Sequence, residues 1–176
     1  MNAYPVTDAV TYVGVDDPDL TLFEGQYPVQ PAGVSYNSYV ITDQTIAVMD
    51  TVDARATDAW LENLDFALDG RTPDYLVISH MEPDHAANIA RLSARYPEMK
   101  LVGNAKTFAM MGQFFGPDAA PADRLVTVGE GDVLELGSHR LRFFMAPMVH
   151  WPEVMVSYEE SEKLLFSADA FGRFGA

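Results

Sequence analysis

The chain has 176 residues, of which 48% are hydrophobic, and this length and composition predict one globular domain, spanning residues 1–176, with a substantial core. Its formal net charge at pH 7 is −15, and only 11 lysines and arginines are spread along it. Phosphate contacts need clustered cations, so we do not expect nucleic-acid binding. The absence of cysteine excludes disulfides, thiolate nucleophiles and cysteine-held iron–sulfur clusters.

No targeting or membrane segment is predicted. Residues 1–10 contain no basic residue and no hydrophobic stretch of the signal-peptide type. No apolar run approaches the ~20 residues that a membrane helix needs. We therefore expect a cytoplasmic protein without a membrane partner.

The first half of the chain predicts β-structure and then a helix. Alternating or continuous apolar stretches predict strands at 10–14, 20–23, 34–42 and 45–49, the last two forming a hairpin across Asp43 and Gln44. A helix is predicted from Asp53, which can cap its start, to Leu68, with Gly70 closing its end. A buried strand at 75–79, a helix from Asp84 to Tyr96 and a strand at 99–102 follow.

The second half changes from alternation of strands and helices to consecutive short strands. An apolar stripe through Phe108 predicts a helix that closes at Gly116 and Pro117. Strands are then predicted at 125–128, 133–136, 141–145, 154–158 and 164–166. This order predicts an α+β fold in which a sheet with helices on one face packs on a second sheet. Since only ten residues follow the apolar strand at 164–166, we expect the chain to stop within its domain or to complete its core with another chain.

The sequence His80-Met81-Glu82-Pro83-Asp84-His85 packs two imidazoles and two carboxylates into the turn after the strand at 75–79. Burying these groups together without a cation would be costly, so the hexapeptide predicts a metal site. Residues two apart in an extended turn point to one side, so we expect His80, Glu82 and Asp84 to converge, with His85 directed to a second metal.

Two further candidates also follow apolar strands: His150 follows the strand at 141–145, and Asp169 follows the strand at 164–166. We expect Asp169 to bridge two ions. A single His or Asp at a strand end is more often a cap or turn residue, and we predict that role for Asp50 and Asp53 and a surface position for His139. Imidazole and carboxylate donors without sulfur indicate iron, manganese or zinc.

The hexapeptide resembles the His-x-Glu-x-Asp-His motif of the flavodiiron proteins, a branch of the metallo-β-lactamase fold. Hydrolases on that fold usually carry a His where this chain has Glu82. The resemblance covers nearly the whole chain, including the motifs at 35–39, 50–52, 149–153 and 165–172. It implies an αββα sandwich, incomplete in its C-terminal part, that works as a homodimer.

The resemblance also implies a di-iron centre and an activity. His80, Glu82, His150 and Asp169 would bind one iron, and Asp84, His85 and Asp169 the other. Such a centre reduces dioxygen to water, or nitric oxide to nitrous oxide, with electrons from FMN.

The sequence departs from the family pattern in two respects. The family supplies a further His to the second iron, and no His of this chain is left for that role. No phosphate-binding loop of a flavodoxin-like FMN domain is present either, so we expect the N-terminal portion of a flavodiiron protein that receives electrons from a separate flavodoxin-like domain or flavoprotein. Two other interpretations remain: a dinuclear metal-dependent hydrolase of the same fold, and a non-catalytic remnant.

Overall fold

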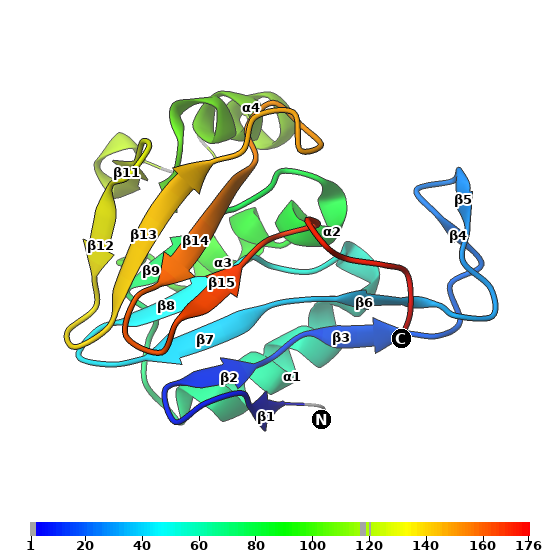
Figure 1. Cartoon of the computed structure of the whole chain (residues 1–176), viewed down its shortest axis with the longest axis horizontal. Helices are drawn as coiled ribbons and strands as arrows, with labels where there is room; N and C mark the ends of the chain where they lie inside the picture. The colour runs from blue at the N-terminus through cyan, green and yellow to red at the C-terminus, as the bar shows by residue number, and fades with distance from the viewer. Residues whose placement is uncertain (1–2, 117–118, 120) are drawn as a thin grey trace.

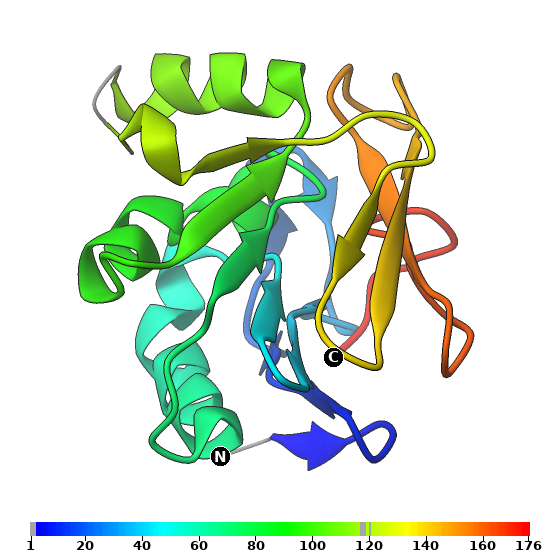
Figure 2. The ribbon, with the colours of Figure 1, turned by 90° about the vertical axis from the view of Figure 1, so that its left-hand side faces the viewer.

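The structure is a computed structural model that describes residues 3–116, 119 and 121–176. Its elements form three layers: helices, a seven-stranded mixed sheet and a four-stranded antiparallel sheet (Figure 1, Figure 2). None of the described helices is long and apolar enough to cross a membrane.

The seven-stranded sheet lies in the middle of the molecule. Its order is β1 (Tyr4–Pro5), β2 (Val10–Tyr12), β7 (Tyr39–Thr42), β8 (Ile46–Met49), β9 (Tyr75–Val77), β10 (Lys100–Gly103) and β11 (Leu125–Thr127). In this order the neighbours β1, β2, β7 and β8 pair antiparallel, whereas the neighbours β8, β9, β10 and β11 pair parallel. The parallel strands β8, β9 and β10 are buried almost throughout, which explains their continuous apolar runs.

Helices cover the outer face of this sheet, as Figure 2 shows. They are η1 (Ala54–Ala56), α1 (Thr57–Leu68), α2 (Pro83–Ala86), α3 (Ile89–Arg95), α4 (Ala105–Phe115) and η2 (Ala122–Arg124). Trp60 and Leu64 of α1 and Leu92 of α3 are fully buried in one core with Val48 and Leu76 of the sheet. The helices that connect the parallel strands thus pack their apolar faces against one side of the sheet.

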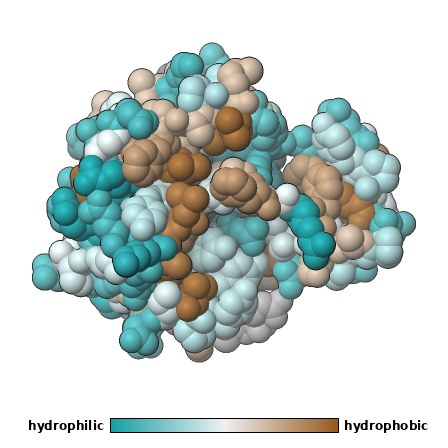
Figure 3. Space-filling view, in the orientation of Figure 1, coloured by the Kyte–Doolittle hydropathy of each residue, from teal (hydrophilic) through white to brown (hydrophobic). Residues whose placement is uncertain are grey.

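The opposite face of the large sheet packs on the four-stranded sheet of β12 (Val133–Glu135), β13 (Arg140–Met145), β14 (Met155–Glu159) and β15 (Leu164–Phe166). A second core fills the space between the sheets, with Ile41, Met49 and Val77 on one side and Leu141, Phe143 and Met155 on the other. No helix of the described residues covers the outer face of the small sheet, and Figure 3 shows an apolar strip on the surface of the molecule. Phe144 of β13 and Leu165 of β15 are exposed.

The expected metallo-β-lactamase-like α+β sandwich is confirmed, although several element boundaries were wrong. The stretch 34–42 is two strands, because β6 (Val34–Tyr36) pairs with β3 (Val15–Asp17) whereas β7 pairs with β2 and β8. A separate small hairpin pairs β4 (Leu22–Phe23) with β5 (Tyr27–Pro28). Strand pairing partners are tertiary contacts, so sequence periodicity alone could not divide the stretch.

The helix predicted from Asp84 to Tyr96 is also two helices, α2 and α3. Asn88 stands between them, and its side chain donates to the Val52 carbonyl and accepts from the Thr57 hydroxyl, both at 2.7 Å. These bonds to other elements compete with continuation of the helix.

Capping residues were assigned with mixed success. Asp53 accepts from the Arg55 amide and therefore caps η1, while α1 begins at Thr57. At the end of α1, Asp69 is also left-handed, with φ of 47°, so Gly70 does not close the helix alone. Helix α4 starts before the predicted apolar stripe, because Asn104 accepts from the amides of Lys106 and Thr107. The helix ends at Gly116 as expected, and Pro117 lies outside the described residues.

His139 is not a free surface residue. Its Nδ1 lies 2.7 Å from Oδ2 of Asp43, and its side chain is 15% exposed. The same carboxylate accepts from the His139 amide and the Ser138 hydroxyl. Asp43 belongs to the turn between β7 and β8, so this cluster joins the two sheets at the end opposite the candidate site.

Arg124 provides a test of how the helical layer is attached. Its guanidinium donates to the carbonyls of Ser93, Tyr96 and Met99 at 2.9–3.1 Å, and so ties η2 to the end of α3. We expect Arg124→Met to lower the free energy of unfolding by about 1–2 kcal/mol, because three carbonyls lose a charged donor.

Arg91→Met is the matched control. Arg91 lies 3.7 Å from Asp58, and both side chains are largely exposed, so its loss should cost less than about 0.5 kcal/mol. Urea unfolding at pH 7 measures both variants, and equal effects would contradict the assigned role of Arg124.

Candidate metal centre

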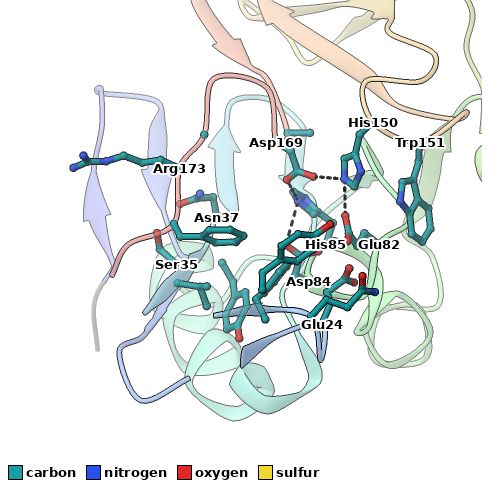
Figure 4. Close-up of a pocket in the computed structure, with 18 residues that line it drawn as sticks. Glu24, Ser35, Asn37, Glu82, Asp84, His85, His150, Trp151, Asp169 and Arg173 are labelled. Atoms are coloured by element: carbon teal, nitrogen blue, oxygen red, sulfur yellow. Dashed lines mark hydrogen bonds and ion pairs between the residues drawn. The ribbon is translucent and has the colours of Figure 1, made fainter. Parts of the chain in front are cut away.

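Six potential ligand side chains come together at one end of the sandwich. His80 and Glu82 lie in the loop after β9, and Asp84 and His85 lie in α2. His150 lies in the loop between β13 and β14, and Asp169 follows β15. Loops from both sheets therefore reach the same rim, as expected when ligand-bearing loops follow neighbouring strands (Figure 4).

Four of these side chains form a first group, which consists of His80, Glu82, His150 and Asp169. Nε2 of His80 lies 2.9 Å from Oε2 of Glu82 and 3.3 Å from Nε2 of His150. Nε2 of His150 lies 2.8 Å from Oε2 of Glu82 and 3.1 Å from Oδ2 of Asp169. Both imidazoles thus direct Nε2 to one point, which two carboxylate oxygens also face.

Asp84, His85 and Asp169 form a second group. Nε2 of His85 lies 2.7 Å from Oδ1 of Asp169 and 3.6 Å from Oδ2 of Asp84. Asp169 therefore presents Oδ2 to the first group and Oδ1 to the second. This is the arrangement of a bridging carboxylate.

The expectation from alternation was wrong for Asp84, which groups with His85 and not with His80 and Glu82. Glu82 still has extended backbone, with ψ of 145°, but Pro83 begins helix α2. Alternation of side chains ends where the strand-like backbone ends. The observed grouping is the one that the family resemblance implies, while the ligand roles themselves remain predictions.

The donor geometry fits metal ions. Ligands ~2.0–2.2 Å from a shared ion stand roughly 2.8–3.6 Å apart at octahedral or tetrahedral angles. The separations in the first group are 2.8–3.4 Å. In the second group, Oδ1 of Asp84 is buried and has no hydrogen-bond partner among the described residues. A buried carboxylate oxygen without a partner is costly, and a cation at this point would satisfy it.

Asp50 was predicted to be a turn residue, and the structure gives it a further role. It follows β8 and has a φ of 53°. Its Oδ1 accepts from the Ser79 amide at 2.6 Å, and its Oδ2 lies 3.2 Å from Nδ1 of His85. A carboxylate behind an imidazole fixes the tautomer and orientation of the ring. Its position at the end of a buried strand was the signal available in the sequence.

Glu153 stands behind His80 in the same way. Oε1 of Glu153 lies 2.7 Å from Nδ1 of His80 and accepts from the Met81 amide at 2.8 Å. Trp151 covers the side of the same imidazole, with ring centroids 5.2 Å apart at 86°. Sequence reasoning placed this loop in the family motif but did not assign Glu153 a role.

Glu24 was also missed, because it lies in the turn between β4 and β5, far from the hexapeptide in sequence. It lines a cavity of about 780 Å³ together with Glu82, Asp84, His150 and Trp151. Figure 4 shows Glu24 beside Glu82. A hydrogen bond with Glu82, burial and repulsion by the site carboxylates raise the pKa of Glu24 to about 7.

The carboxylates of the site have divergent pKa values. Burial raises the pKa of Asp84 to about 6, assisted by repulsion from Asp169 and Glu82 and opposed by His85. Burial also opposes ionisation of Glu82 and Asp169. Hydrogen bonds and attraction from the imidazoles outweigh that cost and hold the pKa of each near 2. In the metal-free protein the imidazoles of His80 and His85 therefore serve as cations of the site.

The imidazoles of His80 and His85 show the complementary shifts. Burial disfavours the charged form of His80, but hydrogen bonds with Glu153 and Glu82 raise its pKa to about 9. The pKa of His85 is also raised well above its ordinary value, because hydrogen bonds with Asp169 and Asp50 outweigh the effect of its burial. Metal binding would displace these protons.

The fold and the site together define a class of protein. A two-sheet sandwich with loops that gather imidazoles and carboxylates into two groups with a shared aspartate is the architecture of the metallo-β-lactamase-like metal proteins. The chain belongs to the ODP family of beta-lactamases, whose model matches residues 34–176.

Curated relatives share the sequence over most of this chain. It is 35% identical over 169 residues to the anaerobic nitric oxide reductase flavorubredoxin of Pectobacterium atrosepticum, which covers 96% of this chain and 33% of the relative. It is 31% identical over 173 residues to the flavo-diiron protein FprA2 of Clostridium acetobutylicum, covering 98% of this chain and 42% of the relative. The chain thus spans about a third to two fifths of these relatives.

Solved structures share the fold. The flavodiiron protein of Giardia intestinalis superposes with a TM-score of 0.92 at 28% identity, covering 100% of this chain and 42% of the other. The rubredoxin oxygen:oxidoreductase of Desulfovibrio gigas superposes with a TM-score of 0.91 at 31% identity, covering 99% and 43%.

The shifted pKa values predict how the metal-free protein responds to pH. A histidine whose pKa is raised in the folded state stabilises that state fully at pH values below its unfolded pKa of ~6.5. For His80 this contribution is lost as the pH rises through the folded pKa of about 9. Glu82 and Asp169 have depressed pKa values, so their carboxylates stabilise the folded state at pH values above ~4. That contribution is lost only as the pH falls toward about 2. The Tm of metal-free protein should therefore fall between pH 6.5 and 9.

His80→Gln should flatten this decline, whereas His139→Gln, outside the site, should keep it. Thermal unfolding in chelator-treated buffer across this range measures the slopes. An unchanged slope in His80→Gln would contradict the assigned ion pairs.

Proposed function

We propose that residues 1–176 form the di-iron domain of a flavodiiron-type oxidoreductase, which reduces dioxygen to water, nitric oxide to nitrous oxide, or both. The observation that carries this proposal is the pair of sulfur-free donor groups that share Asp169. Glu82 adds an anionic oxygen to the first group, and hard anionic ligands with imidazole suit iron.

His80, Glu82, His150 and Asp169 would hold one iron, and Asp84, His85 and Asp169 the other. Two adjacent ferrous ions would supply electrons and open coordination positions to a bound diatomic molecule. Asp169 would set the spacing of the two metal positions. The surrounding protein would keep other ligands from reaching the metals from the buried side. His80 is fully buried, whereas the side chain of His150 is 54% exposed, so the site is accessible from the His150 side.

The cavity beside the two groups is consistent with a small substrate and a separate electron donor. Its volume of about 780 Å³ exceeds what a diatomic molecule fills, and aromatic side chains such as Tyr27, Trp151 and Phe174 line it. Dioxygen and nitric oxide are neutral, so the net charge of −15 does not oppose their entry. By the family resemblance, the donor would be FMN in a flavodoxin-like domain or flavoprotein, and the assembly a cytoplasmic homodimer.

The direct test is reconstitution. The chain is loaded anaerobically with Fe²⁺, supplied with a reduced FMN flavoprotein, and exposed to dioxygen or nitric oxide while gas consumption and nitrous oxide are recorded. We expect consumption above the rate of the flavoprotein alone, and loss of that excess in Asp169→Asn. No excess with either gas in the fully iron-loaded chain would overturn the proposed reductase activity.

Glu82 should determine which metal the chain prefers. Protein expressed with iron and zinc both available should contain more iron than zinc, and Glu82→His should shift the ratio toward zinc, because imidazole replaces an anionic oxygen. Elemental analysis measures the ratio. Stoichiometric zinc in every wild-type preparation would favour the hydrolase interpretation, in which a metal-bound hydroxide is the nucleophile.

The two metal positions should differ in affinity. The first group offers four side chains and the second offers three, including the shared Asp169. We expect the second position to bind at least ~10-fold more weakly, a loss of the size that follows removal of even an outer-shell partner. Anaerobic Fe²⁺ titration should show two steps.

His85→Ala should remove the weaker step and His80→Ala the stronger one. Two equally tight ions in the wild-type chain would instead require a ligand that the described residues do not supply.

A further inference from the structure

The His80 ring is constrained at both of its nitrogens. Nδ1 lies 2.7 Å from Oε1 of Glu153, whereas Nε2 faces Glu82, His150 and Asp169. An ionised carboxylate can only accept a hydrogen bond, so Nδ1 must carry the hydrogen. When the ring is neutral, the lone pair of Nε2 is therefore directed into the first donor group.

Glu153 also joins three segments of the fold. The oxygen that faces His80 accepts from the Met81 amide at 2.8 Å, so it holds both the ring and the backbone of the loop after β9. The main-chain carbonyl of Glu153 accepts from Nδ2 of Asn104 at 2.6 Å. Asn104 is itself fixed as the N-cap of α4. The loop that carries His150 is thereby attached to the loop that carries His80.

The charge on Glu153 is not explained by the fold alone. Its side chain is fully buried, its Oε2 has no hydrogen-bond partner, and its ion-pair partner among the described residues is His80. A neutral glutamine could accept the same bonds from His80 and Met81 without burying a charge. The group that the anion favours is a cation at, or beyond, the imidazole ring.

Glu159 provides an internal comparison on β14. It is also fully buried, but its two oxygens accept from the amides of Arg140, Ser161 and Glu162 at 2.6–3.3 Å. Those bonds fix the turn between β14 and β15. Glu159 therefore has a sufficient structural role, and none of these three bonds involves a residue of the metal centre.

We propose that Glu153 is a positioning residue for the first metal position. It holds His80 as the tautomer with a free Nε2, strengthens that nitrogen as a donor by placing an anion behind the ring, and keeps the His80 and His150 loops at a fixed separation. This inference deepens the proposed function, since it rests on a metal that binds to the first group.

Iron affinity in Glu153→Gln, with Glu159→Gln as the matched control, tests the proposal. Both changes remove one buried charge and keep the side-chain shape. Anaerobic titration of the purified chain with Fe²⁺ against a chromogenic chelator should show the first position weakened ~10–100-fold in Glu153→Gln, with the second changed by less than ~3-fold. Glu159→Gln should leave both positions unchanged. Unchanged iron affinity in Glu153→Gln, or equal losses in both variants, would overturn the proposal.

A second measurement does not depend on metal or on the folding of a variant. In the metal-free wild-type chain, at a pH at which the His80 ring is neutral, ¹⁵N-detected NMR of the imidazole should show His80 with its hydrogen on Nδ1. A hydrogen on Nε2 would overturn the role of Glu153. Failure of the proposed function is distinct, because the iron-loaded wild-type chain would then consume neither gas above the rate of the flavoprotein alone, while Glu153→Gln still weakened iron binding at the first position.

Discussion

The shared carboxylate of Asp169 is the interaction on which the candidate centre depends. Its Oδ1 lies 2.7 Å from His85 and its Oδ2 lies 3.1 Å from His150, so one residue after β15 meets side chains from both sheets. This contact requires the two sheets to pack face to face with their loops at the same rim. The core of Met49, Val77, Phe143 and Met155 between the sheets maintains that alignment.

Behind the donors, two buried carboxylates hold two buried imidazoles. Asp50 lies behind His85 and Glu153 lies behind His80, and each also accepts from a backbone amide of the loop after β9. Such pairs add little to net stability, because desolvation offsets their attraction. Their value lies in orientation, since an imidazole held on one nitrogen presents the other in a fixed direction.

The electrostatics of the site follow from the same packing. Four carboxylates from three separate stretches of the chain line the cavity, and the pKa of Asp84 rises to about 6 while that of Glu82 falls to about 2. Neighbouring carboxylates with such different values indicate a site short of positive charge. In the metal-free chain the imidazoles of His80 and His85 supply positive charge, and metal ions at the two groups would supply it in their place.

The sequence alone predicted the class of the fold and the six candidate ligands, because both depend on local features. Buried strands have continuous apolar runs, helices have periodic ones, and two imidazoles with two carboxylates in the hexapeptide at 80–85 are unusual wherever they occur. Tertiary structure decided which donors share a position. Alternation placed Asp84 with His80, but Pro83 starts a helix and turns Asp84 toward His85. It also decided the roles of Glu24, Asp50 and Glu153, which lie far from their partners along the chain. A lone carboxylate has the same local pattern whether it caps a turn or supports an imidazole, and only the packing of one loop on another distinguishes the two.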